Sequence, residues 1–245
     1  TIFTFALTLS LSRLLFAPAF KTAVLQGTSG SYGNVGYMGL PLSVAFFGAE
    51  AAVPAALVFC FDCALQAIMT SFLATFADER GGEARWGKVA VRIGREVATH
   101  PFIVATAVGV LASAFQIEAP GAIAVLLDML MKAAGPAALF ALGVTVGMRR
   151  FAGVAPDLLL VSGMKVIVHP VLAFAVVSMV PGTPPLWLHV AVMMAALPTA
   201  SNAFILASQY KAYVEGASAA VIVTTIASAV TVPLLVYAIK AGVLP

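Results

Sequence analysis

Long apolar runs separated by short polar segments dominate the chain. A run of about 20 apolar residues is long enough to cross the hydrocarbon core of a bilayer as a helix. Eight such runs occur, at residues 1–17, 22–48, 53–77, 100–116, 125–149, 157–179, 187–210 and 214–240. The longest exceed what one straight span needs, so we expect tilted or broken pieces within them. The pattern predicts an all-α, multi-pass integral membrane protein.

Composition agrees with this prediction. The 245 residues are 62% hydrophobic and 9% charged, whereas a soluble domain carries about 25% charged residues. The net charge of +3 does not point to a nucleic-acid partner, because the basic residues lie in the loops beside the apolar runs. The lipid bilayer is therefore the partner that composition predicts.

The positions of Lys and Arg predict the orientation of the spans. Cytoplasmic loops are enriched in these residues. Ten of them lie in or beside the first, third, fifth and seventh connections, and two, Lys132 and Lys240, lie in or beside the others. We therefore expect the odd-numbered connections to be cytoplasmic. The only substantial polar connection is 78–98, where apolar residues at helical spacing favour a short interfacial helix. A solvated basic linker explains that segment equally well.

Glycine, asparagine and proline interrupt two of the apolar runs, at 33–41 and 196–202. Irregular backbone at membrane depth survives only inside the protein or beside a cavity, and paired breaks indicate a transporter's binding site. The N-termini of half-helices favour anions, and Asn amides offer donors without a buried charge. The candidate substrate-binding residues are Asn34, Gly36, Pro41, Pro198, Ser201 and Asn202. Alternatively, the glycines only allow close packing and the prolines only kink a helix.

The spacing of the two breaks predicts an internal repeat. The second break follows the first by about 165 residues, and the first three runs precede the last three by a similar distance. Five spans per unit is an odd number, so the two units are expected to be inverted across the membrane. We expect ten spans, of which this chain lacks the first two. Residues 1–77 would then be the remainder of the first repeat, 78–98 a cytoplasmic linker, and 99–245 the second repeat.

Ionisable side chains inside the spans are a second signal, because they are costly in a membrane and usually functional. Asp62 shares a helical face with Gln66 and Thr70, and Lys165 shares one with His169. We expect these faces to point inward, and Asp62 and Lys165 to face each other beside the breaks. Such a pair could couple transport to protons. A purely structural ion pair fits the sequence equally well.

The chain resembles a known family. The stretch 33–41 resembles the first crossover of the auxin efflux carrier family, and 195–210 resembles the second. His100-Pro101 and 138–143 also match the family pattern. The short polar linker is similar to bacterial members, among which are malonate-type carriers, rather than to the plant PIN-FORMED exporters.

The resemblance implies two inverted five-helix repeats that form a scaffold domain and a transport domain, with two broken helices crossing near the bilayer midplane. It also implies a homodimer in the inner membrane that moves small carboxylates, such as malonate or auxin-like acids, by alternating access. Transport would be secondary active or facilitative, and a proton or sodium ion could be coupled to it.

Two rival functions remain open. A sodium-coupled symporter of the bile-acid carrier type shares the fold, but it would need carboxylates or several carbonyls near the breaks, and only Asp62 is an obvious acidic candidate. A membrane sensor that binds an anion without moving it is the other. The sequence shows no catalytic set, nucleotide-binding loop, cofactor motif or His/Cys metal cluster, so we do not expect an enzyme. Cys60 and Cys63 are interpreted as two small apolar residues one helical turn apart.

Overall fold

The computed structural model describes residues 1–78, 101–147 and 155–243, with a few isolated positions between them. Most of the 78–98 segment, with its expected interfacial helix, and His100 lie outside the described residues. Helices cover all eight apolar runs, as far as these runs are described, and the prediction of an all-α protein is confirmed.

The described elements follow one another along the chain as helices. In the first half they are α1 (Ile2–Phe16), α2 (Phe20–Ser31), η1 (Val35–Gly39), α3 (Leu40–Phe47), η2 (Ala49–Ala51) and α4 (Ala52–Asp78). They continue with α6 (Pro101–Ala114), α7 (Gly121–Gly147), α8 (Pro156–Gly163), η3 (Met164–Val168), α9 (His169–Ser178), α10 (Pro185–Ala195), α11 (Ser201–Tyr210) and α12 (Val214–Lys240). Both η1 and η3 are π-helical, and each continues directly into the α-helix that follows it.

Proline and glycine account for several of these boundaries. Pro101, Pro156 and Pro185 are the first residues of α6, α8 and α10, where the missing N–H would have no helical partner in any case. Gly48 ends α3 at φ 88°, a conformation that costs glycine little because it has no Cβ.

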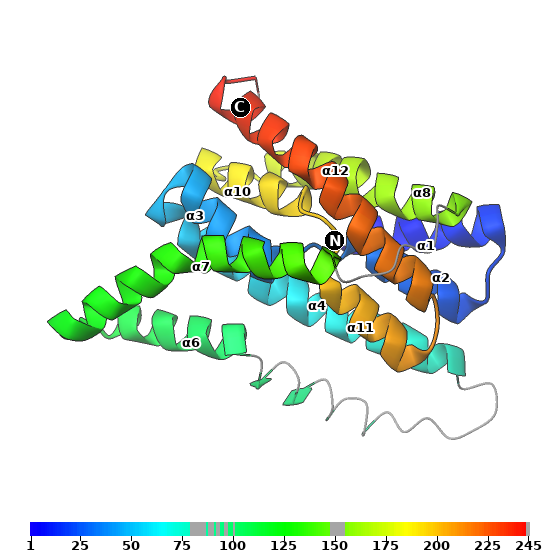
Figure 1. Ribbon diagram of the computed structural model, residues 1–245, viewed down its shortest axis with the longest axis horizontal. Coiled ribbons are helices and arrows are strands. Elements are labelled where there is room, and N and C mark those ends of the chain that lie inside the picture. Colours follow the sequence, from blue (N-terminus) through cyan, green and yellow to red (C-terminus); the bar gives the residue numbers. More distant parts are fainter. Residues whose placement is uncertain are drawn as a thin grey trace.

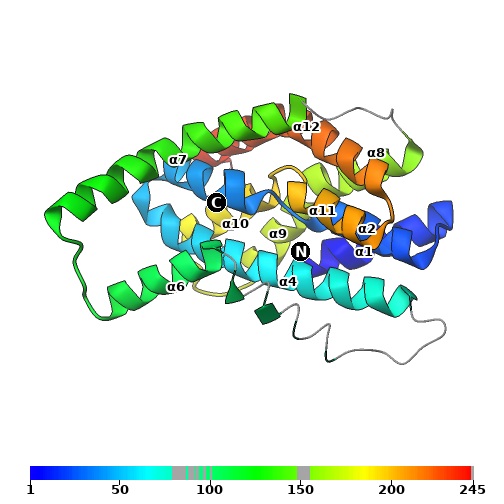
Figure 2. The same ribbon diagram turned by 60° about the horizontal axis from the view of Figure 1, so that its bottom comes forward.

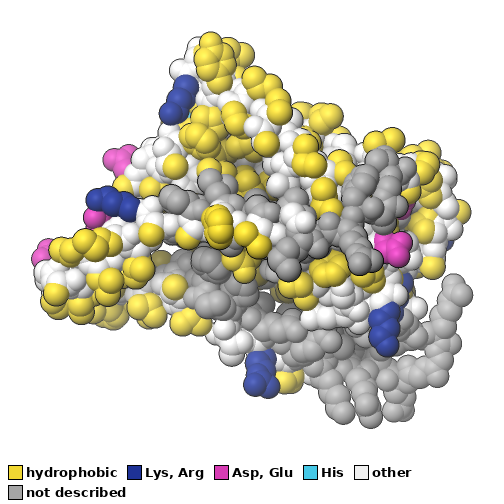
Figure 3. Space-filling model, viewed as in Figure 1, with side chains coloured by type: hydrophobic (Ala, Val, Ile, Leu, Met, Phe, Trp, Pro, Cys, Tyr) yellow, Lys and Arg dark blue, Asp and Glu magenta, His cyan; other side chains and the backbone are white. Residues whose placement is uncertain are grey.

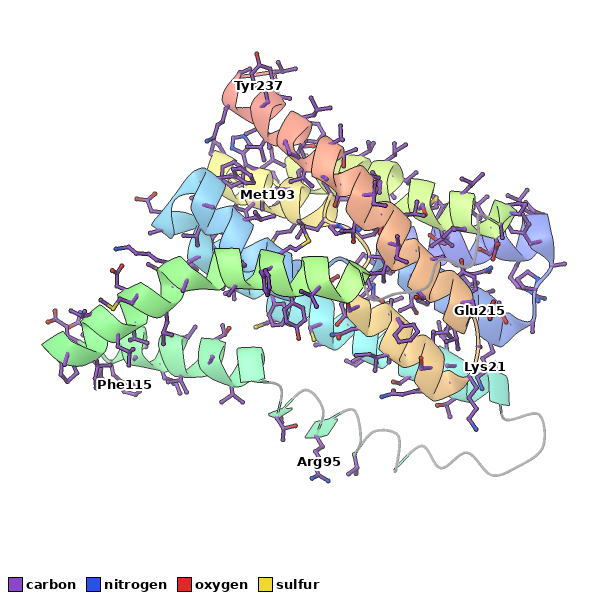
Figure 4. All side chains as sticks on the ribbon, in the orientation of Figure 1. Lys21, Arg95, Phe115, Met193, Glu215 and Tyr237 are labelled. Atoms are coloured by element: carbon purple, nitrogen blue, oxygen red, sulfur yellow. The ribbon has the colours of Figure 1, made fainter. Side chains whose placement is uncertain are left out.

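Three continuous helical stretches in the described chain are long and apolar enough to cross a membrane: Ala49–Ala77, Pro156–Ser178 and Val214–Lys240. Large apolar side chains also lie on the outer surface of the described chain. Tyr237 on α12 and Phe115, just after α6, are each 73% exposed, whereas Met193 lies in the interior of the bundle (Figure 4). The face in Figure 3 is largely hydrophobic, with few charged side chains among its coloured atoms. An apolar exterior of this extent is typical of a membrane protein.

Most of the helices form one bundle, and α6 and α7 lie apart from its centre (Figures 1 and 2). Within the bundle, α1 packs along α2, α10 packs on α9, and α4 packs on α2 and α10. The helices α6 and α7 diverge from the turn that joins them (Figure 2), and α7 contacts η1 and α3 whereas α6 contacts α4. The largest apolar core surrounds the two interrupted segments, and Val35, Phe59, Met194 and Leu197 are among its members.

Small residues let α1 and α2 approach closely. A Cβ on Gly30 would lie 2.8 Å from both Cγ2 and Oγ1 of Thr8, and one on Gly27 would lie 3.2 Å from the carbonyl oxygen of Phe5. Close approach of this kind is how helices associate in a bilayer, where apolar surface alone gives little driving force.

We expect Gly30→Ala to destabilise the protein by about 1–3 kcal/mol, because the added methyl group overpacks a buried contact. Gly163→Ala is the matched control, since a Cβ there meets nothing within 4 Å. It should leave stability unchanged or raise it by up to about 1 kcal/mol. Thermal unfolding of the purified variants in detergent measures both effects. Equal melting temperatures for the two variants would contradict the packing argument.

Candidate functional site

The two breaks in the helices lie against each other and pair through their backbones. The first separates α2 from η1 at Tyr32–Asn34, and the second separates α10 from α11 at 196–200. The N–H of Asn34 donates to the carbonyl oxygen of Pro198 at 2.8 Å, and the N–H of Ala200 donates to that of Tyr32 at 2.9 Å. These bonds form a single antiparallel bridge between Gly33 and Thr199. Each break thus satisfies backbone groups of the other, as a low-dielectric interior requires.

Thr199 extends this network to α2 and α12. Its hydroxyl donates to the carbonyl oxygen of Ser29 at 2.8 Å, and its backbone N–H donates to Oγ1 of Thr224 at 2.9 Å. The last carbonyls of a helix have no partner within the helix. A hydroxyl from the second break therefore satisfies a carbonyl near the end of the half-helix that leads into the first break.

Lys165 satisfies a carbonyl at the end of the other half-helix, α10. Its Nζ donates to the carbonyl oxygen of Ala195, the last residue of α10, at 2.6 Å, and it lies 3.0 Å from Nδ1 of His169. The side chain is fully buried. Because an ammonium group can only donate, the His169 nitrogen is the acceptor. A cation at this point also complements the negative end of the α10 dipole.

Asp62 lies on α4 beside the first break, and only one of its oxygens is satisfied. Oδ1 accepts a hydrogen bond from the hydroxyl of Thr1 at 2.5 Å, whereas the buried Oδ2 has no hydrogen-bond partner. Asp62 and Lys165 are both buried near the crossing, but these two described residues form no direct ion pair. One turn from Asp62, Gln66 donates to the hydroxyl of Ser31 at 2.7 Å, so this polar face of α4 lies on α2.

A cavity of about 120 Å³ lies between the two breaks. It is lined by Tyr32, Gly33, Asn34, Val35, Gly36, Tyr37, Phe59, Ala200, Ser201 and Asn202. The amide nitrogen of Asn34 is buried and has no partner, whereas that of Asn202 donates to the hydroxyl of Tyr32 at 3.2 Å. The N-terminus of α11 begins at this cavity. The cavity wall therefore contains hydrogen-bond donors and the partial positive charge of a helix N-terminus.

A second cavity of about 200 Å³ lies on another side of Val35, which lines both. Its wall is largely apolar, but it also contains Asp62 and His169. Asp62 and His169 therefore line one cavity, and the two candidate amides line another beside the same crossing.

The structure brings four of the six candidate substrate-binding residues to the smaller cavity: Asn34, Gly36, Ser201 and Asn202. Pro198 lies in the second break and contributes its carbonyl oxygen to the pairing. Pro41 lies inside α3, because the π-helix η1 resumes regular structure immediately after Asn34. The first break is therefore shorter than the 33–41 stretch indicated by the sequence.

Sequence reasoning did not single out Tyr32 or Thr199, which both occupy the crossing. Each lies next to the Gly, Asn and Pro positions that mark a break. A hydroxyl group beside such a position was the signal available, because broken helices need side chains to satisfy freed backbone groups.

Comparison with known proteins agrees with this architecture. The sequence model of a family described as "Membrane transport protein" matches residues 1–236. The chain belongs to the membrane transport protein family. This finding confirms the resemblance to auxin efflux carriers drawn from the two breaks.

Two known proteins are similar to this chain along most of its length. A "Putative malonate transporter" of Rhizobium meliloti (strain 1021) is 39% identical over 241 residues, which cover 98% of this chain and 75% of that protein. An "Uncharacterized transporter" of Methanothermobacter thermautotrophicus is 29% identical over 201 residues, which cover 82% of this chain and 63% of that protein. The relatives are named as transporters, which agrees with a role that is not enzymatic.

We expect Thr199→Val to destabilise this membrane transport protein by about 1–3 kcal/mol, because the carbonyl of Ser29 would remain buried without its hydroxyl partner. Thr225→Val is the control, since the Thr225 hydroxyl donates only to a carbonyl of its own helix, that of Val221. That change should stay within about 0.5 kcal/mol. The two melting temperatures in detergent decide the matter, and an unaffected Thr199→Val would show that the bond does not hold the crossing together.

Proposed function

We propose that this membrane transport protein is a secondary carrier of small organic anions, with a carboxylate bound between the crossed breaks. The observation that carries the proposal is the buried, unpartnered amide nitrogen of Asn34 in a cavity at the N-terminus of α11. A relative named as a malonate transporter supports a small dicarboxylate such as malonate as the substrate.

The chemistry of the smaller cavity suits a carboxylate. The first N–H groups of a helix have no helical partner and carry partial positive charge, and α11 presents this end through Ser201 and Asn202. The amide of Asn34 supplies a further donor. Asp and Glu are missing from the described residues that line this cavity. Its volume of about 120 Å³ lies below the range of about 300–1,000 Å³ for sites of drug-sized ligands, which favours a short anion.

The arrangement of helices supports alternating access. In the proposed mechanism the bundle that contains both breaks is the transport domain, and α6 and α7 belong to the scaffold. The contact of α7 with η1 and α3 supports a sliding surface between these elements, and residues of η1 also line the smaller cavity. Inverted five-span repeats, a ten-span protein in the inner membrane and a scaffold-mediated homodimer complete the proposal, as the family resemblance implies.

Proton coupling through Asp62 is the second part of the proposal. Its unpartnered Oδ2 lies in a largely apolar hollow, with His169 in the same wall and Lys165 nearby on η3. A carboxylate in such a place can take up a proton on one side of the membrane and release it on the other.

Asn34→Asp tests the substrate site. The change keeps the shape of the side chain and puts a negative charge where the anion binds, so we expect the malonate concentration that half-saturates uptake to rise by at least about 100-fold. Gln209→Glu adds the same charge at an exposed position of α11 and should leave binding unchanged. Uptake of labelled malonate and indole-3-acetate into proteoliposomes, with and without proton and sodium gradients, is the measurement. Saturable binding without flux would favour a sensor.

Asp62→Asn tests the coupling. We expect malonate uptake by this variant to become independent of pH while the protein stays folded, because the amide cannot exchange the proton. Asp128→Asn, which removes an exposed carboxylate paired with Lys132 on α7, is the control and should keep the wild-type pH profile. A wild-type profile in Asp62→Asn would sink the coupling hypothesis and leave the anion site standing.

A further inference from the structure

The geometry points to Lys165 as a built-in coupling cation. We infer that its ammonium fills the position at the end of α10 that a free sodium ion would otherwise occupy. The carrier then needs no sodium, and removal of the ammonium creates a site for a small free cation. The inference deepens the proposed carrier function. Its consequence for transport rests on that function, whereas the cation site itself does not.

The position of the ammonium is defined by groups from three segments. It donates to the carbonyl oxygen of Ala195 at the end of α10 and contacts Nδ1 of His169 on its own helix. It also lies 3.4 Å from where a Cβ of Gly33 would stand, in the first break. The charge of Lys165 is therefore held between the two broken segments, although its backbone belongs to neither.

The end of α10 is an electrostatic site for a cation. Carbonyls at the C-terminus of a helix lack helical partners and carry partial negative charge. In transporters with discontinuous helices, such ends and the unwound carbonyls beside them coordinate the coupling sodium ion. Lysine carries a compact, strongly hydrated point charge on a flexible stem. It can satisfy the same carbonyl as an ion, but it cannot leave.

Asp62 adds the charge that this reading requires. The single acidic side chain in the wall of the larger cavity is Asp62, among the described residues, and its Oδ2 is unpartnered. Had Lys165 been a conventional ion-pair partner, its Nζ would bond that carboxylate. Instead, its two contacts go to a helix-end carbonyl and to a neutral acceptor. The ammonium thus balances the negative charge of Asp62 without bonding it, from the position at the end of α10 where a free cation would bind.

The local backbone supports a specialised role for this position. Lys165 lies in η3, a π-helical segment of five residues, and such segments occur often at functional sites. The other π-helical segment of the described chain, η1, follows the first break. Both π-helical segments therefore lie beside the same crossing.

Two substitutions separate charge from packing. Lys165→Ala vacates the position, whereas Lys165→Met fills it with an uncharged chain of similar length. We expect each to lower the melting temperature in detergent by about 5 °C when choline is the only added cation. Sodium or ethylammonium at equal ionic strength should restore most of the loss in Lys165→Ala and none in Lys165→Met. Lys132→Met, at an exposed position on α7, should respond to no cation.

The opposite results overturn the inference. Wild-type protein that is stabilised by sodium over choline would show that the site is not already filled. A Lys165→Met variant as stable as wild type would show that the side chain only packs. If Lys165→Ala cannot be purified in choline, purification in ethylammonium decides: folded protein supports the inference, and its absence overturns it.

Transport gives an independent readout. In proteoliposomes, malonate uptake by wild-type protein should be equal in sodium and choline. Uptake by Lys165→Ala should be at least about tenfold faster in sodium, because a free cation then takes the place of the ammonium. Should wild-type protein carry no anion while the melting temperatures behave as expected, the carrier proposal fails and the cation site stands.

Discussion

The crossing of two broken helices depends on mutual hydrogen bonding of their backbones. An unpaired backbone group in an apolar interior costs several kcal/mol, and each break frees more than one. The two bonds between Asn34 and Pro198 and between Ala200 and Tyr32 remove part of that penalty without any side chain. The breaks are therefore tolerated only as a pair, and α4, α8 to α9 and α12 pack around the point where they meet.

The half-helix ends at this crossing differ in whether their free backbone groups have partners within the protein. The C-terminal ends of α2 and α10 receive donors from within the protein, the hydroxyl of Thr199 and the ammonium of Lys165. The N-terminus of α11 instead opens on a cavity, where the amide of Asn34 also lacks a partner. Satisfied carbonyls beside unsatisfied donors leave a site with positive character, which is the electrostatic basis for proposing an anion as the substrate.

The sequence predicted the features that bilayer physics dictates. Long apolar runs had to become helices, and glycine, asparagine and proline within two of them had to mark breaks. It did not predict how far each break extends, since Pro41 is compatible with a helix once η1 has resumed. The hydrogen-bond partner of Lys165 could not be predicted from the sequence either. Every residue carries a main-chain carbonyl, so nothing in the sequence singles out that of Ala195 as a partner. The sequence analysis therefore paired Lys165 with Asp62, the residue of opposite charge.

The separation of Asp62 from Lys165 bears on how a proton could be coupled to transport. In a direct ion pair, protonating the carboxylate would release the ammonium, and the end of α10 would change with it. Here Lys165 bonds the carbonyl of Ala195 and not Asp62, so protonating the carboxylate removes no hydrogen bond of the ammonium. A proton on Asp62 would then alter the net charge of the larger cavity while the crossing keeps its hydrogen bonds. In the proposed mechanism, coupling therefore acts through the field at the crossing rather than through the breaking of its supports.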